Sequence, residues 1–260
     1  MGKISIDGFI LNRETQPKTS DFPLHYHQSY ELFIVVKGMT TLLVDDKLID
    51  VNEKEIVLLK PDMVHKNVGE NLHDRYSIHF TNEYLLSHFS DKLAKSLSEP
   101  FDNNKIAVTD NIFEQLLYLI KRIEKNIEYA SIHTAEIITL LTDKRNLKTI
   151  ITNAPLKTTD NILEYIRGNY ASISGLDDIA DNIHISKPYL CQLFKKETGV
   201  TISDYLNSIR INNACEILRR GRHNITQTAI LCGYNSTPYF CRVFKNIMHM
   251  TPKEYEQSIL

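Results

Sequence analysis

The sequence predicts a two-domain α+β protein, with an N-terminal β domain followed by an all-α domain. Three observations support this prediction. At 260 residues the chain is longer than one typical domain. Short β-rich runs fill residues 1 to about 80, whereas the C-terminal part has helical periodicity. Near the C-terminus, eight residue types recur fifty positions apart, which indicates that one structural unit occurs twice.

The N-terminal runs are typical of short strands. They are rich in β-branched and aromatic residues and are broken by Gly38, Asp45, Asn52 and Pro61. The runs are Leu32 to Lys37, Thr40 to Val44, Leu48 to Val51, Ile56 to Leu59 and Tyr76 to Phe80. Strands this short and regularly spaced favour a small barrel or sandwich.

A histidine-rich pattern lies among these strands. It reads His25-x-His27-x3-Glu31-x6-Gly38, followed by Pro61-x3-His65. Alternation places His25 and His27 on one strand face, and imidazoles with one carboxylate suit Fe, Mn, Ni or Zn. The pattern resembles the two motifs of cupin barrels and implies a cupin-like fold. The second motif is incomplete, because Met63 replaces its usual glycine.

Three roles stay open for these four residues: polar lining of a ligand pocket, plain barrel structure, or ligands of one metal ion. We expect no metal and no other cofactor; if a metal binds, its ligands are His25, His27, Glu31 and His65. The same residues, with Tyr76, are the candidate effector-binding site. The remaining histidines of the N-terminal part lack paired spacing and are expected to be ordinary surface or core residues: His73, His79, His88 and His133.

Helical periodicity begins after the strands. One stripe predicts a helix of about eighteen residues; its members are Ile112, Leu116, Leu119, Ile120, Ile123 and Ile127. Ala135, Ile138 and Leu141 suggest a partner helix. These helices either cover the barrel or pair two subunits. A segment with Pro155 and several Thr and Asn predicts a linker at 146–159, between domains at 1–145 and 160–260.

The first copy of the repeat predicts a helix-turn-helix. Ser186 is a good N-cap and Pro188 falls in the first helical turn, so a helix begins at about Lys187 and ends at Gly199. Upstream, opened by Ser174 or Asp177, a shorter amphipathic helix carries Leu176, Ile179, Ala180 and Ile183. Only two residues separate it from the next cap, which is typical of a helix-turn-helix.

The second copy follows the same pattern. Ile225, Ala229 and Cys232 form the first helix, and Ser236 caps the next. Between the copies, a segment from about Ser203 to Arg220 is apolar on two sides and must therefore serve two cores. About 18 residues at roughly 1.5 Å each give it a length of roughly 27 Å. That length is close to the roughly 34 Å between adjacent major-groove half-sites of DNA.

The C-terminal part, from about residue 160 to 256, resembles the DNA-binding domain of the AraC/XylS family of bacterial transcription regulators. The residues that carry the resemblance are Leu176-x2-Ile179-Ala180, Ser186-x2-Tyr189-Leu190-x2-Leu193-Phe194-Lys195-x3-Gly199, Tyr205-Leu206-x3-Arg210, Ala229-x3-Gly233-Tyr234, Tyr239-Phe240-x-Arg242-Val243-Phe244-Lys245 and Thr251-Pro252-x2-Tyr255. The sequence departs from the family at His249, where Gly is usual, and at Glu256, where Arg is common.

The resemblance implies a transcription regulator, expected to be an activator, that binds promoter DNA. Base contacts would come from Lys187, Pro188 and Gln192 in one recognition helix and from Thr237, Pro238 and Arg242 in the other. Lys195 and Lys245 would lie nearer phosphates. Gln suits adenine and Arg suits guanine. The alternative for each of these residues is a solvated helix face.

The family further implies a small effector in the cupin domain, expected to be a sugar or glycoside, a homodimer formed by helices within 111–145, and contact with RNA polymerase. The alternative function is a cupin metalloenzyme, of the dioxygenase or isomerase type, fused to a DNA-binding domain. We expect the regulator and no enzymatic activity, because no additional catalytic constellation is evident.

Composition restricts the remaining classes. The formal net charge is −2, with a small positive excess in the C-terminal part. The four cysteines form no CxxC pair or zinc pattern, which favours reduced thiols and a cytoplasmic protein. Apolar runs such as Leu32 to Val36 are far too short to span a bilayer, so no membrane partner is expected.

Overall fold

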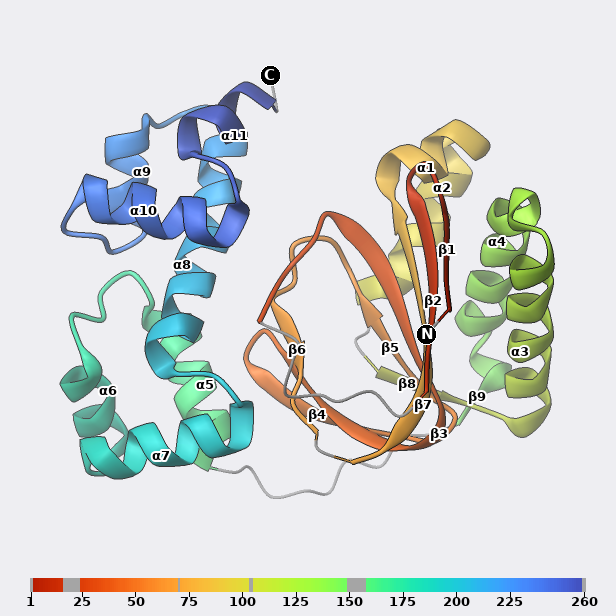
Figure 1. Cartoon of the computed structure of the whole chain (residues 1–260), viewed down its shortest axis with the longest axis horizontal. Coiled ribbons are helices and arrows are strands. Elements are labelled where there is room, and N and C mark those ends of the chain that lie inside the picture. Colours follow the sequence, from red (N-terminus) through yellow and green to blue (C-terminus); the bar gives the residue numbers. More distant parts are fainter. Residues whose placement is uncertain (1, 16–23, 70, 103–104, 149–157, 259–260) are drawn as a thin grey trace.

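The chain forms a β-rich N-terminal domain and a helical C-terminal domain, which lie side by side (Figure 1). The computed structural model describes residues 2–15, 24–69, 71–102, 105–148 and 158–258. The last described element of the β domain ends at Lys148, and the helical domain begins at Thr158. Most of the expected linker therefore lies outside the described residues. The predicted fold class, a two-domain α+β protein, is confirmed.

One strongly curved sheet organises the β domain (Figure 1). Its strands are β1 (Gly2–Ile6), β2 (Phe9–Thr15), β3 (Ser29–Val44), β4 (Lys47–Asn52), β5 (Glu55–Leu59), β6 (His65–Asn67), β7 (His73–Thr81), β8 (Lys105–Val108) and β9 (Leu147–Lys148). The first half of β3 pairs with β5 and β7, and its second half with β4 and β6. Gly38, at φ 79°, lies where the partners change. A Cβ there would lie 2.5 Å from the Leu72 carbonyl oxygen, so this bend requires glycine.

The two faces of the sheet pack against different partners. Leu32 and Ile34 belong to a core shared with the helices, whereas Phe33 and Val35 belong to a core inside the curve. This alternation follows from the two-residue period of a strand. The helical elements of this domain are α1 (Asn82–His88), α2 (Asp91–Ser98), η2 (Glu99–Asp102), α3 (Asp110–Lys125), η3 (Ile127–Tyr129), α4 (Ala130–Thr142) and η4 (Lys144–Asn146).

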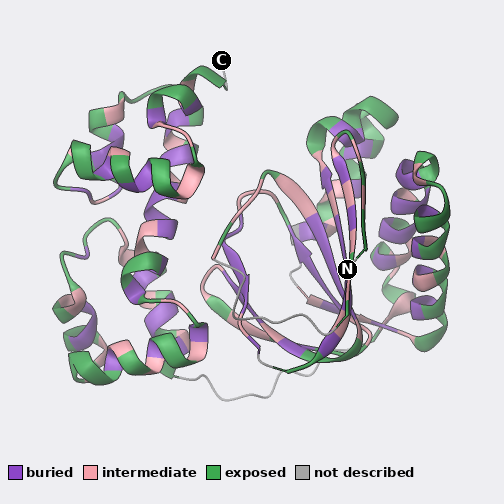
Figure 2. Cartoon of the chain, viewed as in Figure 1, coloured by how far each residue is buried: buried purple, intermediate pink, exposed green. Residues whose placement is uncertain are grey.

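The helical domain contains two copies of the predicted unit. Its helices are α5 (Thr158–Asn169), α6 (Leu176–Ile183), α7 (Lys187–Thr198), α8 (Ile202–Arg219), α9 (Ile225–Leu231), α10 (Thr237–Met248) and α11 (Pro252–Ser258). We call α6–α7 the first unit and α9–α10 the second unit. As predicted, α8 serves two cores: Tyr205 and Ile209 pack in one, Ala214 and Leu218 in the other. Buried residues accordingly lie along its length (Figure 2).

The caps of the two recognition helices match. The side chains of Ser186 and Ser236 each accept a hydrogen bond, of 3.4 Å, from the backbone N–H three residues on. Gly199 ends α7 at φ 64°, and His249 ends α10 at φ 57°. The histidine therefore takes the same left-handed conformation, and the last turn keeps its path. The prediction for α6 was wrong, because its N-cap is Gly175 rather than Ser174 or Asp177.

Candidate functional site

Seven of the eight predicted DNA-contacting residues are exposed. Thr237 is half-buried; the exposed ones are Lys187, Pro188, Gln192, Lys195, Pro238, Arg242 and Lys245. Their recognition helices are held from behind by Leu190 and Phe194 in α7 and by Phe240 and Phe244 in α10, each 0% exposed. The structure thus presents both predicted stripes on rigid helices, with their polar ends accessible to a ligand.

The two stripes each contain two cationic side chains, but the surroundings of these side chains differ. The Arg242 guanidinium lies 5.2 Å from the centre of the Tyr239 ring, which restricts its conformations. Lys187 instead pairs with Asp177 of α6, at 2.9 Å and on the surface. DNA phosphates would have to compete with that carboxylate. The Arg242 guanidinium is therefore oriented before a ligand binds, whereas Lys187 would first have to leave Asp177.

Arg210 links the two units through α8. Its Nε donates to the Tyr170 carbonyl at 2.9 Å and a terminal nitrogen donates to the Ile173 carbonyl at 2.6 Å. The guanidinium also lies 5.3 Å from the centre of the Tyr234 ring, in the turn of the second unit. Since Arg210 is 8% exposed, these bonds fix the loop before α6 and the turn after α9 to one helix.

A second functional cluster lies in the β domain around Glu31. The Glu31 carboxylate is 3.2 Å from His27 Nε2, 3.3 Å from His65 Nε2 and 3.7 Å from His79 Nε2. The centre of the His25 ring lies 4.3 Å from that of His65, with the two rings tilted by 57°. The ligand atoms of His25, His27 and His65 lie within 4.8 Å of one another, as do those of His27, Glu31 and His79. We call these five residues the histidine cluster.

Three of the four histidines were predicted to lie together and one was missed. The expectation that His79 is an ordinary residue was wrong, because β3–β7 pairing sets it directly opposite Glu31. A lone histidine gives no spacing signal, so only the strand register could have identified it. Tyr76 does not join the cluster. It pairs with Ile34 and faces the core beneath the helices, on the other side of β7.

The charges within the cluster support one another. Burial favours a neutral Glu31, but the His79 charge and hydrogen bonds with His27 and His65 outweigh it, so the Glu31 pKa lies well below its usual range. Burial opposes charge on His65 as well, yet its hydrogen bond with Glu31 raises the His65 pKa. The carboxylate is therefore ionised, and His65 is the imidazole whose protonated form it is shown to favour.

The donor set also fits a divalent transition metal. His65 Nδ1 lies 2.9 Å from the Met63 carbonyl and His27 Nδ1 lies 3.0 Å from the Ser29 carbonyl, while the Nε2 atom of each ring faces Glu31. Metal-binding histidines are commonly oriented in this way. His25, His27 and His65, or His27, Glu31 and His79, would hold such an ion, which would supply a Lewis acid for a ligand oxygen.

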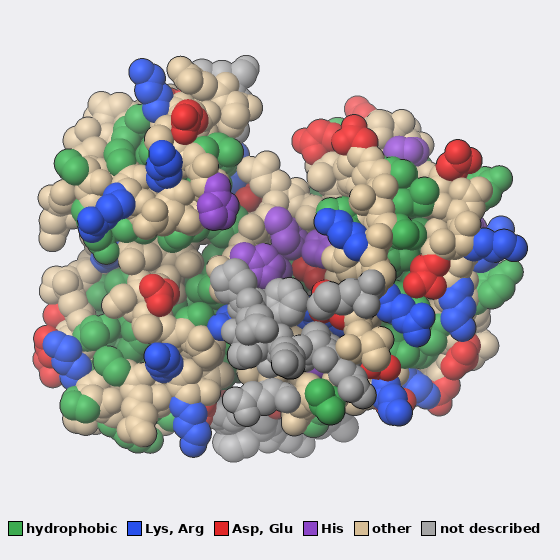
Figure 3. All heavy atoms as spheres, in the orientation of Figure 1, with side chains coloured by type: hydrophobic (Ala, Val, Ile, Leu, Met, Phe, Trp, Pro, Cys, Tyr) green, Lys and Arg blue, Asp and Glu red, His purple; other side chains and the backbone are tan. Residues whose placement is uncertain are grey.

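A pocket of about 610 Å³ lies between the cluster and the helical domain. Histidine side chains gather where the two domains face each other (Figure 3). The pocket is lined by Leu24, His25, Tyr26, His27, Gln28, Asn246, Ile247, Met248, His249, Met250, Tyr255 and Ser258. Among these described residues none is Lys, Arg, Asp or Glu. The described lining residues therefore offer hydrogen-bonding groups and aromatic rings to a ligand, and histidine is the only charge-bearing residue type among them.

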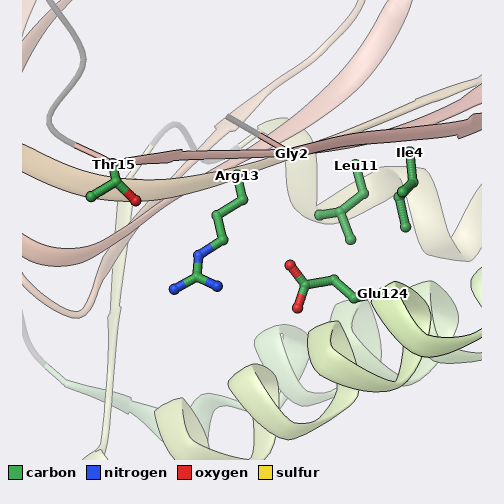
Figure 4. Close-up of a pocket in the computed structure, with 6 residues that line it drawn as sticks. All are labelled: Gly2, Ile4, Leu11, Arg13, Thr15 and Glu124. Atoms are coloured by element: carbon green, nitrogen blue, oxygen red, sulfur yellow. The ribbon is translucent and has the colours of Figure 1, made fainter.

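Another pocket, of about 390 Å³, lies between β1, β2 and α3. Arg13 and Glu124 point towards each other across it (Figure 4). Tyr76 does not line this pocket but lies beside it, since the Arg13 guanidinium is 5.6 Å from the centre of the Tyr76 ring. Burial and then the negative charge of Glu124 raise the Tyr76 pKa. Tyr76 is thus separated from the histidine cluster by the sheet.

Comparisons with known proteins agree with this architecture. Residues 179–258 match a helix-turn-helix domain family, and residues 13–71 match the AraC-like ligand binding domain. The uncharacterized HTH-type transcriptional regulator YdeC of Bacillus subtilis is 24% identical over 254 residues, covering 90% of this chain and 86% of YdeC. The HTH-type transcriptional activator RhaS of Shigella dysenteriae is 22% identical, covering 92% and 89%. A solved structure of ToxT from Vibrio cholerae is 18% identical, covers 97% of this chain and 98% of ToxT, and gives a TM-score of 0.40.

Two helix-turn-helix units attached to a ligand-binding β domain define a DNA-binding transcriptional regulator. The chain belongs to the AraC family of these regulators, with an N-terminal AraC-like ligand-binding domain. The relatives are transcriptional regulators rather than enzymes. Within the described residues, none of the helices combines the length and apolarity needed to cross a membrane.

Proposed function

We propose that the protein activates transcription by reading two successive major-groove half-sites, one with each recognition helix. The observation that carries this proposal is the pair of matched helices, α7 and α10, whose exposed stripes differ in sequence. Gln192 and Arg242 supply the base-reading groups, with Lys187, Pro188, Thr237 and Pro238 beside them. Lys195 and Lys245 bind phosphates and set the register.

The proposed effector is an uncharged, polyhydroxylated molecule, of which a sugar or glycoside is the best example. The pocket beside the histidine cluster has the size of a small-molecule site. Its imidazole and amide groups can bind hydroxyls, and the Tyr26 and Tyr255 rings can cover a sugar face. A carboxylate effector would find no Lys or Arg among the described lining residues. In this proposal, His25 and His27 line the polar side of the site, and Glu31, His65 and His79 lie behind them in the cluster.

We also propose a cytoplasmic homodimer that contacts RNA polymerase at its promoter. Support for pairing through residues 111–145 comes from apolar side chains that the described chain leaves uncovered there. Tyr118 is 61% exposed on α3, Ile132 is 53% exposed on α4, and Tyr129 between them is 50% exposed. A second subunit would bury such residues.

A thermal-shift screen of neutral sugars and glycosides tests the effector assignment. At about 100 times its dissociation constant, a ligand of the native state adds about 2.7 kcal/mol of stability. That gain should raise the midpoint of thermal unfolding by roughly 5–10 °C for a domain of this size. The Glu31→Gln variant should lose most of the shift at the same ligand concentration. Asp110→Asn, on the surface of the same domain, should keep it. If carboxylic acids stabilise the protein and neutral sugars do not, the assignment is wrong.

A further inference from the structure

The segment Leu24–Gln28 faces two domains at once. It joins the β domain through an isolated bridge between His25 and His65, with backbone bonds of 3.1 and 2.8 Å, and it bends at Leu24 and Gln28. The odd-numbered side chains, His25 and His27, belong to the histidine cluster. The even-numbered ones, Leu24, Tyr26 and Gln28, contact the helical domain. Opposite orientation of neighbouring side chains is what an extended backbone imposes.

The even-numbered side chains contact three different helices. The Tyr26 hydroxyl donates to Met248 Sδ at the end of α10, and it lies 3.6 Å from Cys215 Sγ in α8. Gln28 Nε2 donates to the Tyr255 hydroxyl in α11, at 3.5 Å. Leu24 and Tyr26 also pack on the apolar cluster that contains α5 and α7. This short segment thus lies where the two helix-turn-helix units meet.

The turn before His65 reinforces the same contact. Asp62, at φ 67°, donates its backbone N–H to the His27 carbonyl at 2.9 Å, which ties the turn to the segment. Its carbonyl accepts from Asn212 Nδ2 at 2.7 Å, and its carboxylate pairs with Arg219 at 2.8 Å. Asn212, Cys215 and Arg219 follow i, i+3, i+7 spacing and therefore form one face of α8. That face is the one held by Tyr26 and Asp62.

We propose that Leu24–Gln28 and Asp62 form a coupling element that transmits changes at the histidine cluster to the helical domain. A ligand that displaces His25 or His27 must move the backbone they share with Tyr26 and Gln28. Movement of His65 reaches Asp62 through a turn of two intervening residues, Met63 and Val64. Both routes end on α8, which positions the first and second units. The proposal rests on the proposed function in one respect, namely that an effector at the cluster would use this route.

Other contacts between the domains bypass the cluster and provide an internal comparison. Asp46 pairs with Arg167 of α5 at 2.8 Å, and Lys66 donates to the Gly199 carbonyl at 2.9 Å. The Tyr205 hydroxyl donates to the Asp45 carbonyl. None of these side chains is a member of the cluster. They hold α5, the end of α7 and the start of α8 against the β domain through side chains outside the cluster, although Lys66 is the neighbour of His65 in β6.

Hydrogen–deuterium exchange on the full chain tests the proposal without DNA or effector. Glu31→Gln perturbs the cluster while keeping the size of the side chain. Peptides from the C-terminal half of α8, the end of α10 and α11 should exchange about two- to tenfold faster, the range for loss of single hydrogen bonds. In a Tyr26→Phe/Gln28→Ala/Asp62→Asn background, adding Glu31→Gln should produce little further change in these peptides, since only the backbone contact of Asp62 with Asn212 remains.

Matched controls make the outcomes unambiguous. Tyr30→Phe/Asp110→Asn also removes one tyrosine hydroxyl and one carboxylate, but from positions of the β domain outside the coupling element. In that background Glu31→Gln should still accelerate exchange in α8, α10 and α11. If Glu31→Gln unfolds the β domain, His79→Gln perturbs the cluster from β7 instead. The proposal is overturned if the cluster variants change exchange only in the β domain, or if their effect on α8–α11 survives without the Tyr26 hydroxyl, the Gln28 amide and the Asp62 carboxylate. Neither result bears on DNA binding or sugar binding, which are measured separately.

Discussion

Phe244→Ala is expected to unfold the second helix-turn-helix unit. The Phe244 ring is 0% exposed and makes edge contacts with Phe240 and Tyr255, at centroid distances of 5.6 and 5.7 Å. Removing a buried aromatic ring costs about 3–5 kcal/mol. Domains have only about 5–15 kcal/mol of stability in total. Urea denaturation followed by circular dichroism should show a clearly lower midpoint, and high-affinity DNA binding should be lost.

The control for this prediction is Ile230→Ala on α9. Ile230 is 65% exposed, and changes at such surface positions usually alter stability by about 0.5 kcal/mol or less. Phe194→Ala should reproduce the large loss in the first unit, because Phe194 is the repeat partner of Phe244 and is also 0% exposed. An unchanged midpoint for Phe244→Ala would show that the second unit does not depend on this core.

Arg242→Ala is expected to relax base preference at one position of one half-site. Arginine on a guanine edge discriminates against other bases by about 1–3 kcal/mol, which is roughly 5- to 150-fold in affinity. Stacking on Tyr239 orients the guanidinium before DNA arrives, which favours a specific contact. The measurement is the affinity for a panel of duplexes that differ at single positions.

Lys245→Ala provides the contrast, since Lys245 lies on the same helix but is assigned to phosphate. It should weaken binding to all duplexes by a similar factor and reduce the slope of log affinity against log salt by about one. A uniform loss for Arg242→Ala would place Arg242 on the DNA backbone, and the assignment of base reading to this residue would then fail.

Local sequence signals predicted the helical domain well. Its recognition helices begin at strong caps, Ser186 and Ser236, and the apolar spacing between them identified α8 with its two cores. These features depend on residues that are close together in the sequence, so they can be recognised from the sequence alone. The predicted strand runs lie in β3, β4, β5 and β7, but β3 is one strand where two were expected, and β1, β2, β6, β8 and β9 were not predicted. Helices α1 and α2 were missed because the apolar stripe of Asn82–Ser98 is short and interrupted by polar residues.

The histidine cluster was only partly predictable. His25, His27, Glu31 and His65 carry a recognisable spacing, and the structure brings them together. The register of β3 with β7 places His79 opposite Glu31 in the cluster. The same register places Tyr76 opposite Ile34, on the other face of the sheet. The contacts of Tyr26 and Asp62 with α8 join residues more than 140 positions apart, at Asn212, Cys215 and Arg219. Long-range register and domain docking are tertiary properties that a single sequence does not display.

The central claim, that the two units read two adjacent and different half-sites, is tested most directly by selecting binding sites for the purified chain from random-sequence duplex DNA. The account predicts enrichment of two unlike sequence elements with centres about 10–10.5 base pairs apart, one helical turn of the duplex. The second element should contain a guanine whose selection disappears with Arg242→Ala. Enrichment of a single element, or of two identical elements, would contradict the account.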